Sequence, residues 1–214
     1  MTTFPGGTSV TAVCAYAGGG TPHLHTTSTE AYVVVGGTGA VQTLDTSGFH
    51  ETPLAEGDTV WFTPGVIHRA INHDDLRLVV IMSNAGLPEA GDAVMTFPPE
   101  VVGDPDRYRT AATLSPPSEE AVQVRRALAL DGFARLRAGG LEAFYDQAVA
   151  LVRPRVPQWR AIVGHADPLL DALAAGDGRH LRAGALFSAP QSEDAGWGMC
   201  GRLRTHDVRN PKGL

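Results

Sequence analysis

Cysteine and long apolar runs are what this sequence has least of. Its two cysteines, Cys14 and Cys200, lie near opposite ends of the 214 residues and match neither a disulfide framework nor a zinc-binding spacing, so we expect two reduced thiols. No stretch approaches the roughly 18 continuous apolar residues of a membrane span. Residues 1–7 also lack the basic and apolar regions of a secretory signal peptide. We therefore expect a cytoplasmic protein that does not enter a membrane.

Basic residues are scarce in the first half of the chain. Residues 1–110 hold 4 lysines and arginines against 12 aspartates and glutamates, which leaves 13 against 11 for residues 111–214. Nucleic-acid binding requires clustered basic side chains that face the phosphate backbone. The acidic first half therefore argues against a nucleic-acid partner.

Runs of β-branched residues predict strands over the first 83 residues. Residues 31–35 and 40–44 have the pattern of a hairpin, and residues 76–82 are the last strand expected in this region. An entry strand is expected at residues 8–17. On that strand Cys14 shares a face with Val10, Ala12 and Tyr16, so we expect its thiol to pack inside.

Three potential metal ligands lie close together in one short segment. His23 and His25 are two residues apart, so their imidazoles leave the same face of a strand. Four residues separate His25 from Glu30, and three of them are Thr or Ser, which suits a turn that returns the carboxylate to the pair. Alternation then places Tyr32 inward with Glu30, either as a candidate pocket residue or as ordinary barrel packing.

A second segment offers a fourth ligand. Residues 57–72 have the pattern of a strand, a Pro-Gly turn and a second strand that carries His68 and Asn72. His73 follows directly, and we expect it to be a turn residue rather than a fifth ligand. Chance surface histidines are the alternative, but the order and distance of the two segments argue against chance.

The two segments together resemble the two motifs of the cupin superfamily, Gly-x5-His-x-His-x3/4-Glu-x6-Gly and Gly-x5-Pro-x-Gly-x2-His-x3-Asn. The spacing from Glu30 to Gly37 is kept, and the second motif is matched at Gly57, Gly65, His68 and Asn72. Two turn positions depart from the pattern. Four residues instead of five separate Gly18 from His23, and Thr63 stands where the motif has proline, directly before Pro64.

The resemblance implies an antiparallel jelly-roll β-barrel whose His23, His25, Glu30 and His68 bind one divalent metal ion. Iron is the favoured metal, while manganese, nickel and zinc remain open. Three neutral imidazoles and one carboxylate leave about two of the six positions of an octahedral ion free for water, substrate or dioxygen. Such a site is suited to catalysis.

The resulting functional hypothesis is a metal-dependent enzyme that acts on a small organic molecule, with an iron(II)-type dioxygenase, an oxidoreductase, as its leading form. Two alternatives stay open. One is a redox-neutral isomerase, cyclase or lyase that uses a Lewis-acid metal. The other is a cupin that binds a small molecule without catalysis, since the cupin fold alone does not determine the reaction.

The second half of the sequence predicts helices. Ser118 and two following glutamates are a helix start for residues 119–139, and apolar residues recur at three- and four-residue steps over 141–152. A further short helix is expected at residues 169–175. The expected fold is thus mainly β. It has a cupin barrel at residues 1–97, a proline-rich linker or arm at 98–118, and a helical region with an irregular tail at 119–214.

The tail from residue 178 has two possible positions: over the mouth of the barrel, or as a strand added to its edge. Exposed barrel edges and apolar helix faces both require a partner surface, so we expect a homodimer.

Overall fold

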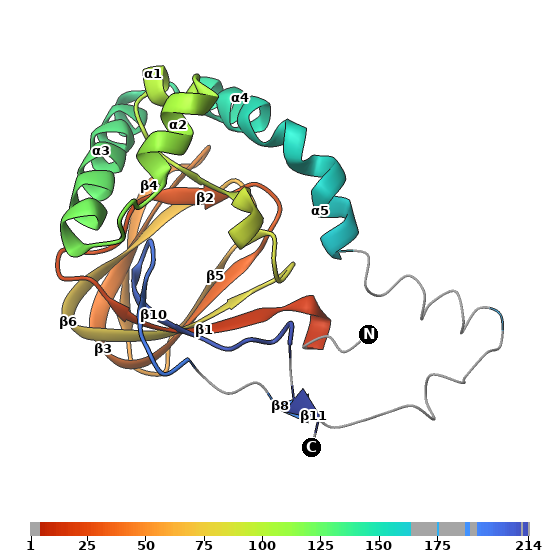
Figure 1. Cartoon of the computed structure of the whole chain (residues 1–214). Coiled ribbons are helices and arrows are strands. Elements are labelled where there is room, and N and C mark those ends of the chain that lie inside the picture. The colour runs from red at the N-terminus through yellow and green to blue at the C-terminus, as the bar shows by residue number, and fades with distance from the viewer. Residues whose placement is uncertain (1–4, 164–174, 176–186, 189–191, 211, 214) are drawn as a thin grey trace.

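Two long strands form the centre of the sheet in the computed structural model, which describes residues 5–163, 175, 187–188, 192–210 and 212–213. Strand β3 (Glu30–Asp45) and strand β6 (Ile67–Met82) pair antiparallel, with register shifts between Val34 and Gly39. Because each strand is 16 residues long, each crosses the barrel and continues into its other half. The remaining strands of this sheet join the pair directly or through a neighbouring strand (Figure 1).

Within the described residues, the other strands complete a nine-stranded sheet, whose antiparallel pairing the sequence predicted. Four of them pair with β3 or β6: β4 (Gly48–Ala55) and β5 (Thr59–Phe62) with β3, and β1 (Ser9–Ala15) and β2 (His23–His25) with β6. The short strand β7 (Ala93–Met95) pairs only with β2 and was not predicted. Strand β2 is therefore held between β6 and β7.

The tail returns to the barrel. Strands β9 (Gly196–Trp197) and β10 (Gly201–Thr205) form a hairpin, and β10 pairs with the free edge of β1 from Thr11 to Ala15. The sequence left open whether the tail lies over the mouth of the barrel or adds a strand to its edge. The described segment, residues 196–205, adds a strand to the edge. The strands β8 (Phe187–Ser188) and β11 (Lys212–Gly213) form a separate pair.

In the described part of the chain, five α-helices lie over one end and one flank of the barrel (Figure 1). They are α1 (Pro99–Val102), α2 (Pro105–Ala112), α3 (Glu119–Ala138), α4 (Leu141–Val152) and α5 (Val156–Val163), with short turns at Pro5–Gly7, Pro88–Asp92 and Arg153–Arg155. Ser118 caps α3 by accepting a hydrogen bond from the Ala121 N–H at 3.1 Å, as its position predicted. None of the described helices is long and apolar enough to cross a bilayer.

Several expectations differ from the structure, and one cannot be compared with it. The hairpin expected from residues 31–35 and 40–44 is wrong, because both segments belong to the single strand β3 and pair with β6 instead of with each other. The segment 98–118, expected as a linker or arm, forms α1 and α2, and its division from the flanking regions stays a prediction. The inward packing of Cys14 is wrong: its side chain is exposed, because Val13 and Ala15 take the buried face of β1. The helix expected at residues 169–175 lies almost wholly outside the described residues.

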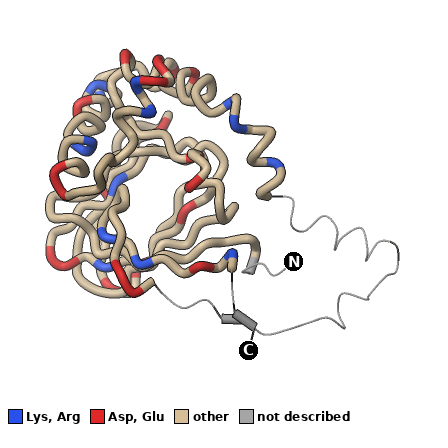
Figure 2. Tube along the Cα trace, viewed as in Figure 1, with Lys and Arg blue, Asp and Glu red and all other residues tan. Residues whose placement is uncertain are grey.

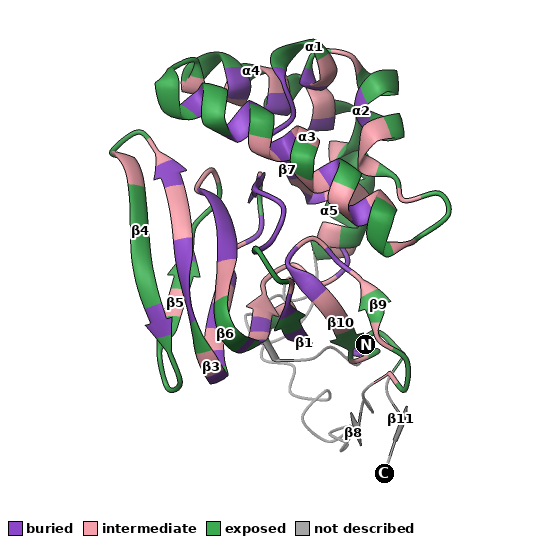
Figure 3. Ribbon diagram, turned by 90° about the vertical axis from the view of Figure 1, so that its left-hand side faces the viewer, coloured by how far each residue is buried: buried purple, intermediate pink, exposed green. Residues whose placement is uncertain are grey.

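Two hydrophobic cores result from this arrangement. The first lies inside the barrel and includes Tyr32, Val34 and Leu78. The second lies between the outer face of the barrel and the helices, where Leu24 and Ile67 share one cluster with Phe133 and Phe144. Figure 3 shows the helices stacked on the barrel, with buried residues on both sides of the contact. The helical region is thus a cover for the barrel.

The contact between α3 and the barrel is closest at Gly132. A Cβ atom there would overlap the carbonyl oxygen of Thr96 and the backbone of Phe97. The Thr96 hydroxyl also donates to the Ala129 carbonyl of α3 at 2.8 Å. A glycine in this helix allows the backbones to approach each other directly.

We expect Gly132→Ala to destabilise the protein by about 1–3 kcal/mol, because the added methyl group forces α3 away from the barrel. Helix propensity alone would make the variant more stable by about 1 kcal/mol. The sign of the change in the free energy of unfolding therefore distinguishes the two effects. Urea unfolding followed by circular dichroism measures the difference. Ala134→Gly, at an exposed position of the same helix, reports the propensity effect alone. A Gly132→Ala variant more stable than the wild type would contradict the close contact.

Candidate metal centre

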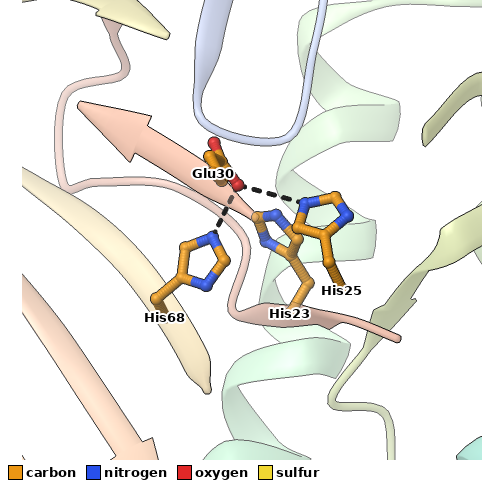
Figure 4. A group of neighbouring side chains, drawn as sticks. All are labelled: His23, His25, Glu30 and His68. Carbon is orange, nitrogen blue, oxygen red and sulfur yellow. Dashed lines mark hydrogen bonds and ion pairs between the residues drawn. The ribbon is translucent and has the colours of Figure 1, made fainter. Parts of the chain in front are cut away.

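Three strands bring four potential ligands together inside the barrel. His23 and His25 lie on β2, Glu30 is the first residue of β3, and His68 is the second residue of β6. One ligand atom from each residue lies within 4.8 Å of the others, and all four side chains are buried. Figure 4 shows the three imidazoles and the carboxylate converging on one point. The residues singled out in the sequence therefore form one cluster that could hold a metal ion.

The register of the sheet explains the convergence. His23 is paired directly with His68, so the two imidazoles leave neighbouring strands on one face, with ring centroids 4.5 Å apart. Glu30 follows the turn after β2 and directs Oε2 to 2.9 Å from His68 Nε2 and 3.1 Å from His25 Nε2. The segment from residue 26 to 29 acts as the predicted turn.

A hydrogen-bond acceptor holds the Nδ1 atom of each histidine. The Nδ1 of His23 lies 2.8 Å from the Thr21 carbonyl, that of His68 3.0 Å from the Val66 carbonyl, and that of His25 3.2 Å from Asp92 Oδ2. Since an acceptor requires Nδ1–H, Nε2 is the nitrogen of each ring that is left to face the cluster. This orientation by outer partners is typical of histidines that bind metal ions.

The residue that sequence reasoning missed is Asp92. Its carboxylate is fully buried and, besides the imidazole of His25, it accepts hydrogen bonds from the backbone N–H groups of Thr26, Thr27 and Ser28 and from the Thr26 hydroxyl. The one carboxylate therefore both orders the turn between β2 and Glu30 and orients the imidazole of His25. No local pattern marks Asp92, because its partners lie more than 60 residues earlier in the chain.

The charges of the cluster suit a cation. Burial, assisted by His68 and His25, lowers the pKa of His23 to about 3, so that ring is neutral at pH 7. Burial by itself would raise the pKa of Glu30, but His68 and His25 outweigh it and hold that pKa well below its usual range. Burial likewise opposes protonation of His25, but the carboxylates of Asp92 and Glu30 raise its pKa to about 9. A metal ion entering the cluster would displace that proton.

Tyr32 lies beside the cluster, within the barrel core. Its side chain is fully buried, with ring centroids 5.1 Å from Phe62 and 6.1 Å from His68. Its hydroxyl is 3.5 Å from the thiol of Cys200. Burial, with further contributions from Cys200 and Glu30, raises the pKa of the phenol, which stays protonated. Its inward direction is confirmed, whereas its role in a pocket stays a prediction.

The remaining motif residues have structural positions. Asn72 donates to the Ala15 carbonyl at 2.8 Å and accepts from the Leu76 N–H at 3.0 Å, so it ties a bend in β6 to β1. His73 is exposed and stands outside the four-residue cluster, although it continues β6 instead of forming a turn.

The turn between β9 and β10 completes the surroundings of the cluster. The Met199 carbonyl accepts a hydrogen bond from the Thr21 N–H at 2.9 Å, two residues before His23. Cys200 contacts Tyr32, two residues after Glu30. The tail therefore reaches the ligand strands as well as the barrel edge.

One family model matches part of the chain. Residues 12–83 match the family model described as Cupin domain. No curated protein sequence matches the chain. Among solved structures, a double-stranded β-helix protein of Klebsiella pneumoniae has 21% identity and a TM-score of 0.30, covering 35% of this chain and 64% of that one.

Two further solved structures are similar to the same extent. The nucleoside dehydratase Pac13, from Streptomyces, has 17% identity and a TM-score of 0.31, covering 36% of this chain and 58% of its own. The capsular polysaccharide assembling protein CapF of Staphylococcus aureus has 24% identity and a TM-score of 0.29, with 36% and 23% covered. The match thus spans less than two thirds of each of these structures, and it concerns the fold alone.

We expect Asp92→Asn to lower the free energy of unfolding by about 3 kcal/mol, because an amide presents an N–H₂ group to donors that require an acceptor. Urea denaturation of the metal-free protein measures this loss. Asp75→Asn is the matched control, since Asp75 is exposed and its ion pair with Arg77 is solvated. Equal stability of the two variants would show that Asp92 does not order the turn.

Proposed function

Because residues 12–83 form a cupin domain, we propose that this protein is a metal-dependent enzyme acting on a small organic molecule. In this proposal His23, His25, Glu30 and His68 bind one divalent metal ion. The observation that carries it is the convergence of four buried ligand atoms within 4.8 Å of one another.

A hydrogen-bonded core cluster without a metal is the competing explanation. It accounts for the ion pairs of Glu30 Oε2 with His25 Nε2 at 3.1 Å and with His68 Nε2 at 2.9 Å. It leaves three buried imidazoles against one carboxylate, with their Nδ1 atoms already used. A cation shared by the Nε2 atoms and Glu30 would give every ring a partner on that side.

An oxygen-dependent oxidation is the leading form of the reaction. Iron(II) in a site of imidazole and carboxylate ligands, with positions left open, supplies the activation of dioxygen. Manganese, nickel and zinc fit the same four ligands. The chain itself contributes order: the ring of Phe62 stacks on His68, with centroids 4.4 Å apart and planes inclined by 8°, and Asp92 fixes His25.

A redox-neutral isomerase, cyclase or lyase is the second candidate. Such chemistry needs a group that holds a proton near the substrate. The buried phenol of Tyr32 remains protonated and lies against His68, so it is the residue that favours this candidate. A cupin that binds a small molecule without turnover is the third, and the same experiments separate it from both.

The predicted homodimer belongs to this proposal. Val35 and Trp61 are large apolar side chains exposed on β3 and β5, with 46% and 68% of their surfaces accessible. Their exposure supports a partner surface on that side of the barrel.

We expect the purified protein to bind about one divalent metal ion per chain, and His25→Ala to weaken that binding at least 100-fold, since even outer partners of such ligands contribute about 10–100-fold. Elemental analysis of protein made without a histidine tag, followed by metal titration, measures both. His73→Ala removes an exposed imidazole outside the cluster and should bind as the wild type does. Equal losses in both variants would refute the four-ligand site.

Turnover by the iron(II)-loaded protein should require dioxygen. Oxygen consumption with candidate small-molecule substrates tests this, with the anaerobic reaction as the control. Turnover that continues without oxygen, and that falls in Tyr32→Phe, would favour the redox-neutral candidate instead. Saturable ligand binding with no product under either condition would favour the non-catalytic cupin.

A further inference from the structure

A cavity lies beside strand β7, between the barrel and its helical cover. Its volume is about 470 Å³, within the range of roughly 300–1,000 Å³ that small-molecule sites occupy. It is bordered by strand β7, helices α2 and α3 and the β9–β10 hairpin, through Ala93, Met95, Tyr108, Arg125, Trp197 and Met199. Barrel, helices and tail therefore meet at this one place.

Strand β7 links the cavity to the candidate metal centre. Ala93 is paired with His25 and Met95 with His23 in antiparallel register. Directly paired residues point to the same face of a sheet, with Cβ atoms about 4.5–5.5 Å apart. Two lining residues of the cavity are thus immediate neighbours of two of the four ligands.

Arg125 is an unusual residue for such a wall. Only 8% of its surface is accessible, and it lies on the face of α3 that packs against the barrel, together with Val122 and Ala129. Within the part of the chain that the structure describes, no carboxylate forms an ion pair with it. Burial lowers the pKa of its guanidinium, and Tyr16, Tyr108 and Cys200 oppose this effect, but no carboxylate does. Among the described residues it is a buried positive charge without a carboxylate counter-ion.

The hydrogen bonds of Arg125 leave one of its three guanidinium nitrogens without a partner. It donates to the Ala112 carbonyl at 3.3 Å and to the Gly198 carbonyl at 2.9 Å, so it ties α2 to the β9–β10 turn. Its Nε–H is buried without a partner. Two neutral carbonyls do not balance a buried charge, which costs several kcal/mol unless it is paired. The structural tie therefore explains two donors but not the charge.

The other charged residues that line the cavity are also mostly positive. Arg109 and Arg155 also line it, against one acidic residue, Glu89. Arg109 has Asp106 as a partner at 2.7 Å, whereas Arg155 donates only to the Ala90 carbonyl, at 3.1 Å, among the hydrogen bonds of the described residues. Figure 2 shows the basic residues that recur along α3 and towards α5. An anion entering the cavity would meet a positive surface.

We propose that this cavity binds the oxyanion group, carboxylate or phosphate, of a small organic molecule through the guanidinium of Arg125. The inference rests on the proposed function, because it makes that molecule the substrate of the neighbouring metal centre and assigns it to the organic anions. Arg125 is then a specificity-determining residue. Its Nε–H and the charge left unbalanced are what the oxyanion engages.

Titration of the full-length protein with succinate and, separately, with inorganic phosphate tests the inference, both as purified and after treatment with a chelator. Trp197 lines the cavity, so its fluorescence reports occupancy. We expect saturable binding of at least one anion at constant ionic strength, no binding of the neutral succinamide, and at least ten-fold weaker anion binding in Arg125→Gln. The tighter of the two anions identifies the group that the cavity recognises.

Arg126→Gln is the matched control. Arg126 follows in the same helix, but its guanidinium donates to the carbonyls of Ala17 and Gly19 outside the cavity. The affinity of the Arg126→Gln variant for the anion should therefore stay within about two-fold of the wild type. Arg125→Lys keeps the charge and loses the Nε–H. We expect an intermediate affinity, which also decides the matter if Arg125→Gln fails to fold.

Absence of saturable binding to both anions would overturn the inference, as would unchanged affinity in Arg125→Gln or in Arg125→Lys. An equal loss in Arg126→Gln would do the same, because it would indicate attraction by overall charge. Binding after chelator treatment does not require an ion in the cluster. The anion titration therefore judges the cavity, while metal binding by His25→Ala judges the metal centre.

Discussion

The buried carboxylate of Asp92 is the interaction on which the candidate site depends. It satisfies three consecutive backbone N–H groups at residues 26–28 and the Nδ1–H of His25, and so it closes the turn that brings Glu30 back to the two histidines of β2. Without an acceptor at this place, the turn would bury unpaired donors. The four-residue cluster is thus built by a residue that does not belong to it.

A second constraint is the division of the structure into an inner and an outer core. Alternation along β2 and β6 sends His23, His25 and His68 inward and Leu24 and Ile67 outward to the helices. The outer contact is close enough to require Gly132 in α3. The helices thereby cover the strands that carry the ligands and bring the positive charge of Arg125 to the edge of the barrel.

The sequence predicted those features whose determinants are local. The histidine pair, the turn to Glu30 and the second motif lie within short segments, and the bounds of α4 follow from its apolar period and from Pro154. It did not predict Asp92, strand β7, the β9–β10 hairpin or the cavity around Arg125, because each requires contacts between segments far apart in the chain. The prediction that Cys14 faces inward failed for a related reason. Alternation defines the two faces of β1, and only the packing of its partners β6 and β10 decides which face is buried.

The pairing of β1 with β10 also has a consequence for folding. Thr11 and Thr205 are partners across nearly the whole chain, and such distant pairing forms slowly because a long loop must close first. The metal ligands and Asp92 all lie within the first 92 residues, whereas the cavity requires α2, α3 and the turn at residues 197–199. During synthesis the residues of the proposed ion site therefore emerge before those of the proposed anion site, and the β9–β10 turn joins both of them last.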